Sequence, residues 1–170
     1  MTITVHSSSS HGGRDVAERK HWNEFVNDAG GGIGVVTCKE SDVDEVAPTA
    51  PEGTVARIVR GSRCDTKAHT LREWAAAFQF PGHFGGNWDA FEDCINDLGW
   101  LHADCAVAIV THADEMLPRS AKEFTLLLSI LTAAQDGGAL QVVLHCEPGR
   151  TAALRKRMAG PGKAAARRIA

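Results

Sequence analysis

The sequence predicts an α/β protein in which a small parallel three-stranded sheet packs against helices, with an N-terminal extension able to add a strand and a helix. The unbroken apolar run 105–111 is typical of a strand buried on both faces, and 140–145 (LQVVLH) predicts a strand of the same kind. Segments of helical periodicity lie between the strands, and parallel strands need such long crossover connections. The length of 170 residues, with 44% hydrophobic and 23% charged residues, is typical of one globular domain.

The first third of the chain predicts little regular structure. Residues 1–13 are a serine, histidine and glycine segment that is expected to be disordered. Residues 14–29 are consistent with a helix, and 33–38 is a short β-rich run. The segment 41–53 contains two prolines and is predicted to be a loop. We therefore expect a domain boundary near residue 53.

A regular alternation of strands and helices follows this boundary. The expected elements are a strand at 55–60, helices at 65–79 and 87–98, a strand at 105–111, a helix at 120–135 and a strand at 140–145. Pro148 and Gly149 are predicted to close the ordered part. The chain is thus divided into a partly disordered N-terminal extension, 1–53, an α/β domain, 54–147, and a basic C-terminal tail, 148–170.

Charge is distributed unevenly along the chain, although the net charge is only −3. Seven of the 18 Lys and Arg residues lie from Arg150 onward, where no acid occurs, so residues 1–149 carry a formal charge of −10. Between Glu73 and Glu115 there are eight acids and no Lys or Arg. The body is therefore acidic and the tail basic, an asymmetry that concerns partners rather than the fold.

Motifs for enzymes, cofactors and metals are missing from the sequence. The glycine run 30–34 precedes a strand, so it cannot hold a phosphate at a helix N-terminus, and no P-loop or nucleophile elbow occurs. The histidines are scattered, and the five cysteines include no C-x-x-C pair. No enzyme activity, cofactor or metal is expected. The start of the chain is not typical of a secretion signal, so a cytoplasmic location is expected, without a membrane span.

The segment 87–98 has the clearest helical periodicity in the chain. Asn87 is placed to cap the helix, and apolar residues gather on one side. The opposite side carries Asp89, Glu92, Asp93, Asn96 and Asp97. Such a face is usually a solvated surface, but acids four residues apart repel by a few tenths of a kcal/mol, and no basic residue is nearby in the sequence. A face that lowers stability without local compensation favours a binding surface.

The run PGHFGGNWDAFEDCINDLGW resembles the signature of the barstar family, intracellular inhibitors of the secreted ribonuclease barnase. The matching residues are Pro81, Phe84, Gly85, Asn87, Asp89, Ala90, Asp93, Cys94 and Trp100. The resemblance extends over about residues 54–146, because a preceding strand and a following helix and strand occur in the family's order. It implies a parallel three-stranded sheet with helices packed against it.

The resemblance also implies a function: the helix and the loop before it would block the cationic active site of a ribonuclease or nuclease toxin, as an immunity protein or antitoxin does. Asp93 would mimic an RNA phosphate, and Asp89 would pair with a second cationic group. The partner-binding residues implied are His83, Gly85, Asn87, Trp88, Asp89, Glu92, Asp93 and Trp100.

Four positions depart from the family pattern, and one alternative function stays open. His83 stands in place of a tyrosine, Trp88 of a smaller aliphatic residue, Glu92 of a tryptophan and Thr132 of an acid, so the identity of the nuclease does not follow. The alternative is a nucleic-acid-associated protein that uses the basic tail, which contains R-K-R and R-R. The tail has no aromatic residue for stacking, so only non-specific contact with nucleic acid is expected.

Overall fold

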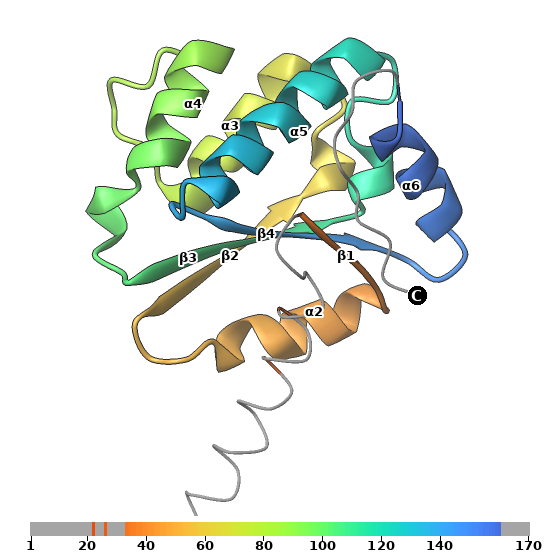
Figure 1. Cartoon of the computed structure of the whole chain (residues 1–170), viewed down its shortest axis with the longest axis horizontal. Helices are drawn as coiled ribbons and strands as arrows, with labels where there is room; N and C mark the ends of the chain where they lie inside the picture. The colour runs from red at the N-terminus through yellow and green to blue at the C-terminus, as the bar shows by residue number, and fades with distance from the viewer. Residues whose placement is uncertain (1–21, 23–25, 27–32, 161–170) are drawn as a thin grey trace, which may run out of the picture.

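The computed structural model describes Trp22, Val26 and residues 33–160. In this part of the chain four strands form one sheet, and every pairing is parallel. The strands are β1 (Gly34–Thr37), β2 (Thr54–Arg60), β3 (Cys105–Thr111) and β4 (Gln141–Cys146), and their order across the sheet is β1-β4-β3-β2 (Figure 1). The α/β class is confirmed, and the extension adds its strand beside β4.

Helices cover both faces of this sheet. One face is covered by α2 (Glu40–Val46), whereas α3 (Lys67–Phe78), α4 (Trp88–Asp97) and α5 (Ala121–Asp136) cover the other (Figure 1). The helix α6 (Thr151–Met158) follows β4, and single 3-10 turns connect several elements, namely η1 (Ala47–Thr49), η2 (Gly61–Arg63), η3 (Gly99–Leu101) and η4 (Ala113–Glu115). The helices predicted at 65–79, 87–98 and 120–135 are confirmed within two residues at each end.

The central strand β3 is buried on both faces, as its apolar run predicts. Ala108 and Val110 contribute to the larger core, beneath α3, α4 and α5. Val107 and Ile109 contribute to a second core on the side of α2. Because side chains alternate along a strand, each face of β3 must be covered by a separate layer.

The prediction of a loop over 41–53 is wrong, because α2 occupies the first part of this segment. Val43 and Val46 lie three residues apart and are 0% and 1% exposed in the second core. The Asp42 carboxylate accepts a hydrogen bond from the backbone N–H of Lys39 at 3.0 Å and caps the helix. A helix of seven residues with four acids has little stability of its own, so burial of its two valines holds it in place.

The predicted helix at 14–29 lies outside the described residues except for Trp22 and Val26. Both of these are helical, and both are 4% exposed in the second core. The segment 1–13 that is expected to be disordered also lies outside the described residues. The side chains that cover the α2 face therefore come from two segments of the N-terminal extension.

The prediction that the ordered part closes at Pro148 and Gly149 is also wrong, because α6 follows them. Leu154 and Met158 lie four residues apart on α6 and are 0% and 5% exposed in the larger core. The sequence pattern was obscured by the basic residues between them, which suggested a solvated tail. The last ten residues of the predicted tail, 161–170, lie outside the described residues.

One of the basic residues of α6, Arg157, connects this helix to the turn before α5. Its guanidinium donates hydrogen bonds to the carbonyl oxygens of Asp114 at 2.6 Å, Met116 at 2.5 Å and Leu117 at 3.2 Å, and it lies 4.1 Å from the centre of the Phe124 ring. Burial lowers the pKa of Arg157, an effect opposed by the charge of Asp114. The turn between β3 and α5 is thus held by α6.

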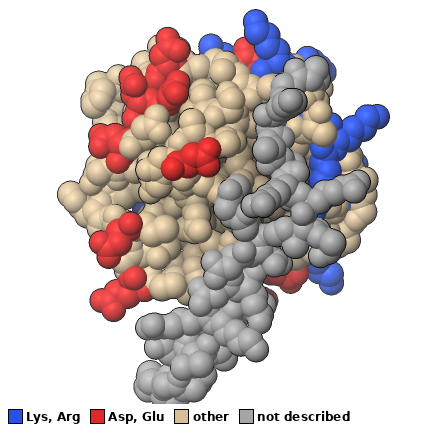
Figure 2. Space-filling model, in the orientation of Figure 1, with Lys and Arg blue, Asp and Glu red and all other residues tan. Residues whose placement is uncertain are grey.

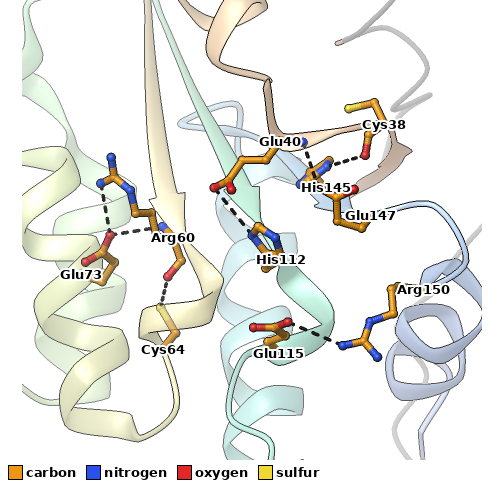
Figure 3. A network of polar contacts seen from close by, with 10 residues as sticks. All are labelled: Cys38, Glu40, Arg60, Cys64, Glu73, His112, Glu115, His145, Glu147 and Arg150. Atoms are coloured by element: carbon orange, nitrogen blue, oxygen red, sulfur yellow. Dashed lines mark hydrogen bonds and ion pairs between the residues drawn. The ribbon is translucent and has the colours of Figure 1, made fainter. Parts of the chain in front are cut away.

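Polar contacts at the carboxyl ends of the strands tie the extension to the domain (Figure 3). His145, which is fully buried, lies 3.0 Å through Nε2 from the carbonyl oxygen of Cys38. Since a carbonyl oxygen only accepts, Nε2 is the protonated nitrogen. The carboxylate of Glu147 accepts from the backbone N–H of Glu40 at 3.0 Å, and the Glu40 carboxylate faces His112. These contacts reinforce the pairing of β1 with β4.

The boundary near residue 53 stays a prediction, and truncation can test it. We expect residues 54–160, which keep α6, to fold but with a free energy of unfolding several kcal/mol below that of residues 33–160, because removal of α2 and β1 exposes Val107 and Ile109. Urea denaturation and binding of a hydrophobic dye would measure the difference. Equal stability of the two fragments would contradict the role of the extension.

The contacts of Arg157 predict a large effect for one substitution. Arg157→Ala should lower the free energy of unfolding by about 2 kcal/mol or more, because three carbonyl groups lose a charged donor. Thermal and urea denaturation would measure it, with the exposed Arg155→Ala on the same helix as the control. An equal, small effect of both substitutions would show that α6 is only loosely attached.

Candidate partner-binding surface

The acidic face predicted on 87–98 lies on α4, which is capped as its sequence indicates. The Asn87 side-chain oxygen accepts a hydrogen bond from the backbone N–H of Ala90 at 2.9 Å. The helix ends at Leu98, which has a positive φ of 45°. Asp89 lies in the first turn, where the helix dipole favours a negative charge, but Asp97 lies in the last turn, where the dipole opposes one.

An aromatic core fixes the position of α4. Phe91 is fully buried, and its ring makes edge contacts with Trp74 at 5.5 Å and with Trp88 at 5.6 Å between centroids. Ile95 is also fully buried one turn later. Aromatic pairs of this kind add about 0.5–1.5 kcal/mol beyond the area that they bury. The helix is therefore held rigidly while its opposite face stays in solvent.

Asp89, Glu92 and Asp93 are all exposed on that opposite face. Within the described part of the chain, no ion pair joins any of them to a Lys, Arg or His side chain. Figure 2 shows acidic side chains over the side of the molecule where α4 lies, and Lys and Arg side chains over the side of α6. Burial raises the pKa of the Cys94 thiol, and the charges of Asp93 and Asp97 raise it further.

The loop before α4 presents His83, Gly85 and Asn87 to solvent. Its backbone turns where Phe84 donates to the carbonyl oxygen of Pro81 at 2.9 Å, and again at Gly86, whose φ of 66° favours glycine. The three exposed residues thus lie on a defined turn that leads directly into the acidic helix.

Aromatic rings support this loop from below. Phe80 contacts Phe84 at 5.0 Å and Trp100 at 5.9 Å between ring centroids. The indole of Trp100 donates to the carbonyl oxygen of Phe78 at 2.9 Å and is half-buried. Trp100 is therefore anchored beneath the loop while part of its side chain stays exposed.

Trp88 has a different position from the other predicted site residues. Its side chain is 7% exposed in the larger core, and its indole N–H donates to the carboxylate of Glu123 on α5. The Lys67 ammonium lies 5.8 Å from its ring centre. Trp88 therefore positions the start of α4 against α5 and offers little surface to a partner. The structure brings the other seven residues to the loop, α4 and η3.

The metal-ligating side chains of the described residues do not form a metal-binding cluster, and burial affects two of the thiols. No group of three His, Cys, Asp or Glu side chains there could hold a metal ion. Burial raises the pKa of Cys38 to about 11 and that of Cys64 to about 12, so both remain protonated thiols near neutral pH. No helix of these residues is long and apolar enough to cross a bilayer.

A family model described as "Barstar (barnase inhibitor)" matches residues 54–147, more than half of the chain. The chain belongs to the barstar family. The match begins at β2 and ends just after β4, so it includes the exposed loop and the acidic helix and leaves out β1, α2 and α6. A comparison with curated protein sequences gave no match.

Solved structures with a similar fold include an ORC2 protein and a chain from a structure of Drosophila ORC. An Aeropyrum pernix ORC2 protein, solved in ADPNP–ADP complexes, is 16% identical with a TM-score of 0.55, and the alignment covers 94% of this barstar-family chain and 46% of that chain. A chain of Drosophila ORC bound to AT-rich DNA and Cdc6 is also 16% identical, with a TM-score of 0.51 and coverages of 92% and 58%. This barstar-family chain spans about half the length of these structures, and the likeness concerns the fold alone.

Sequence reasoning missed the residues that support the site from other elements. Glu123 lies 35 residues after Trp88, and no local pattern joins the two. Phe80 precedes the loop and appears in the sequence as an ordinary apolar residue, although it contacts Phe84, Phe91 and Trp100. Only the aromatic content of the region could have indicated such a support.

The two faces of α4 predict opposite effects on stability. Phe91→Ala should lower the free energy of unfolding by about 3–5 kcal/mol, because it leaves a cavity in the aromatic core. Asp93→Asn should leave it unchanged or raise it by a few tenths of a kcal/mol, because it relieves repulsion with Asp89 and Asp97. Chemical denaturation would measure both. A destabilised Asp93→Asn variant would show that Asp93 has a structural role.

Proposed function

We propose that this barstar-family protein inhibits a ribonuclease or nuclease toxin by inserting α4 and the loop 81–87 into its cationic active site. In the cell it would act as an immunity protein or antitoxin rather than as an enzyme. The observation that carries the proposal is the row of exposed carboxylates, Asp89, Glu92 and Asp93, on a rigidly held helix.

The chemistry of the row suits the active site of an enzyme that cleaves RNA. Such a site must hold phosphate groups with Arg, Lys or His, so carboxylates at a suitable spacing can occupy the same positions. Asp93 would take the place of a phosphate, and Asp89, one turn earlier, would pair with a second cationic group. Acids around them would speed association through long-range attraction, an effect that salt weakens.

Rigidity supports the proposal as much as charge does. The carboxylates are carried by a helix whose Phe91 contacts Trp74 of α3 and Trp88 of its own first turn, and the loop rests on Phe80 and Trp100. A surface that is already ordered loses little conformational entropy when it binds. Binding would also relieve the repulsion among the acids, because cations of the partner would lie between them.

The partner proposed is a ribonuclease that differs in detail from barnase. His83 and Glu92 stand on the exposed surface where the family has aromatic residues, and the hydroxyl of Thr132 bonds to the carbonyl oxygen of Leu128 at 2.8 Å, in place of an acid. The surface therefore presents an added carboxylate at 92 and one fewer at 132. We infer a partner whose cations lie toward the start and centre of α4.

Inhibition by carboxylate variants tests the proposal. The chain would be used to capture a ribonuclease from lysate and culture medium, and inhibition of that enzyme and of purified barnase would be measured with a fluorogenic RNA. Asp93→Ala should weaken inhibition by about thirtyfold or more, about 2 kcal/mol, because cations of the partner are left buried and unpaired; this range rests in part on barnase–barstar itself. Asp89→Ala should weaken inhibition less.

The matched control is Asp44→Ala, which removes an exposed carboxylate from α2 on the other face of the sheet. It should inhibit as the unchanged chain does, and circular dichroism should show that all variants are folded. A folded Asp93→Ala variant that inhibits as well as Asp44→Ala would overturn the proposal.

A further inference from the structure

A second charged surface lies at the junction of α5 and α6. Arg119 and Lys122 lie just before and within the first turn of α5, and Arg155 and Lys156 lie in the last turn of α6; all four are exposed. The contact of Arg157 with Phe124 joins these two helix ends. We call these four residues the basic junction. Blue side chains in Figure 2 gather over this side, away from the acids over α4.

The charges of the basic junction are not used within the described fold. The carboxylates near it have other partners: Asp114 and Glu115 pair with Arg150, and Glu123 accepts from Trp88. Arg157 points inward to backbone carbonyls. Among the described residues, no ion pair includes any member of the basic junction. Four exposed cations therefore remain available to an anionic ligand.

A surface hollow of about 490 Å³ includes Lys122 of the basic junction in its lining. It runs along the outer side of α5 and is lined by Ala121, Lys122, Thr125, Leu126 and Ser129. Leu126 is 38% exposed there, a large apolar side chain left in solvent. The lining thus combines one cation with an apolar floor and two hydroxyl groups, which suits a planar ring and a sugar attached to a phosphate.

We propose that the basic junction binds the sugar–phosphate backbone of single-stranded nucleic acid, with a base lying in the hollow along α5. The four cations neutralise phosphates, and the hollow accepts a base only when it is unpaired. Because no aromatic ring of the described residues lines the hollow, stacking is weak and binding does not depend on sequence. The site is separate from the acidic helix, so the chain could hold a nuclease and a nucleic acid at the same time.

Fluorescence anisotropy with a 12-nucleotide oligouridylate RNA tests this proposal on the full chain. For single strands, each phosphate neutralised contributes about 0.7 to the slope of log affinity against log salt. Arg119→Gln with Lys122→Gln should lower that slope by about 1.4, so that the affinity lost between 50 and 200 mM salt becomes about sevenfold smaller. The matched control, Lys39→Gln with Arg72→Gln, removes two exposed cations, one just before α2 and one on α3, and should leave the slope unchanged.

Binding measurements with other anionic ligands distinguish this proposal from alternative ones. A single-stranded DNA of the same length should bind similarly, since the phosphate chemistry is shared, whereas an RNA duplex should bind more weakly. The proposal is overturned if the duplex binds as tightly, if anionic lipid vesicles bind more tightly than RNA, or if the two double variants have the same slope. It is also overturned if only the removal of Lys163, Arg167 and Arg168 charges changes the slope. Asp93→Ala should not affect RNA binding, so failure here leaves the proposed inhibition untouched.

Discussion

The rest of the structure depends on the burial of β3 on both faces. A strand of seven residues whose six later members are all buried cannot be stable with one layer of helices, because side chains of alternating residues would meet water on the other side. The family segment 54–147 supplies α3, α4 and α5 for one face. The N-terminal extension supplies Val43, Val46, Trp22 and Val26 for the other. The extension thus completes the layering that the sheet requires.

This layering explains why an unfavourable row of acids can persist on α4. The outer layer of an α/β sandwich has one buried side and one free side, and the buried side of α4 contributes Phe91 and Ile95 to the larger core. Repulsion among three acids amounts to only about 1 kcal/mol, less than the burial of either side chain contributes. The burial of Phe91 and Ile95 therefore outweighs the repulsion on the exposed side of α4, and the charge pattern of that side can serve binding.

The sequence predicted those features that depend on local periodicity or on a capping residue. The strands β3 and β4, the helices α3, α4 and α5 and the cap at Asn87 all have such signals, and the structure confirms them. The helices α2 and α6 have only weak signals of this kind, because each is short and highly charged and is held by two buried side chains, Val43 and Val46 or Leu154 and Met158. For the site, the exposed acids were readable, but the buried position of Trp88 depends on Glu123, and that contact is made only in the folded chain.

The separation of charges along the chain becomes a separation in space. The acidic stretch from Glu73 to Glu115 includes the exposed face of α4, while Arg155, Lys156 and Arg157 lie on α6, whose end packs near the start of α5. Two cations of the segment 150–158 have partners within the fold. Arg157 is buried against carbonyl groups, and Arg150 pairs with Asp114 and Glu115. Without these contacts, the positive charges of α6 and of Arg150 would only repel one another. The segment from Arg150 to Met158 therefore uses two of its cations in contacts within the fold and presents Arg155 and Lys156 outward. Opposite faces of opposite charge orient the molecule in the field of any strongly charged partner, because the electrostatic energy then differs between the two approaches.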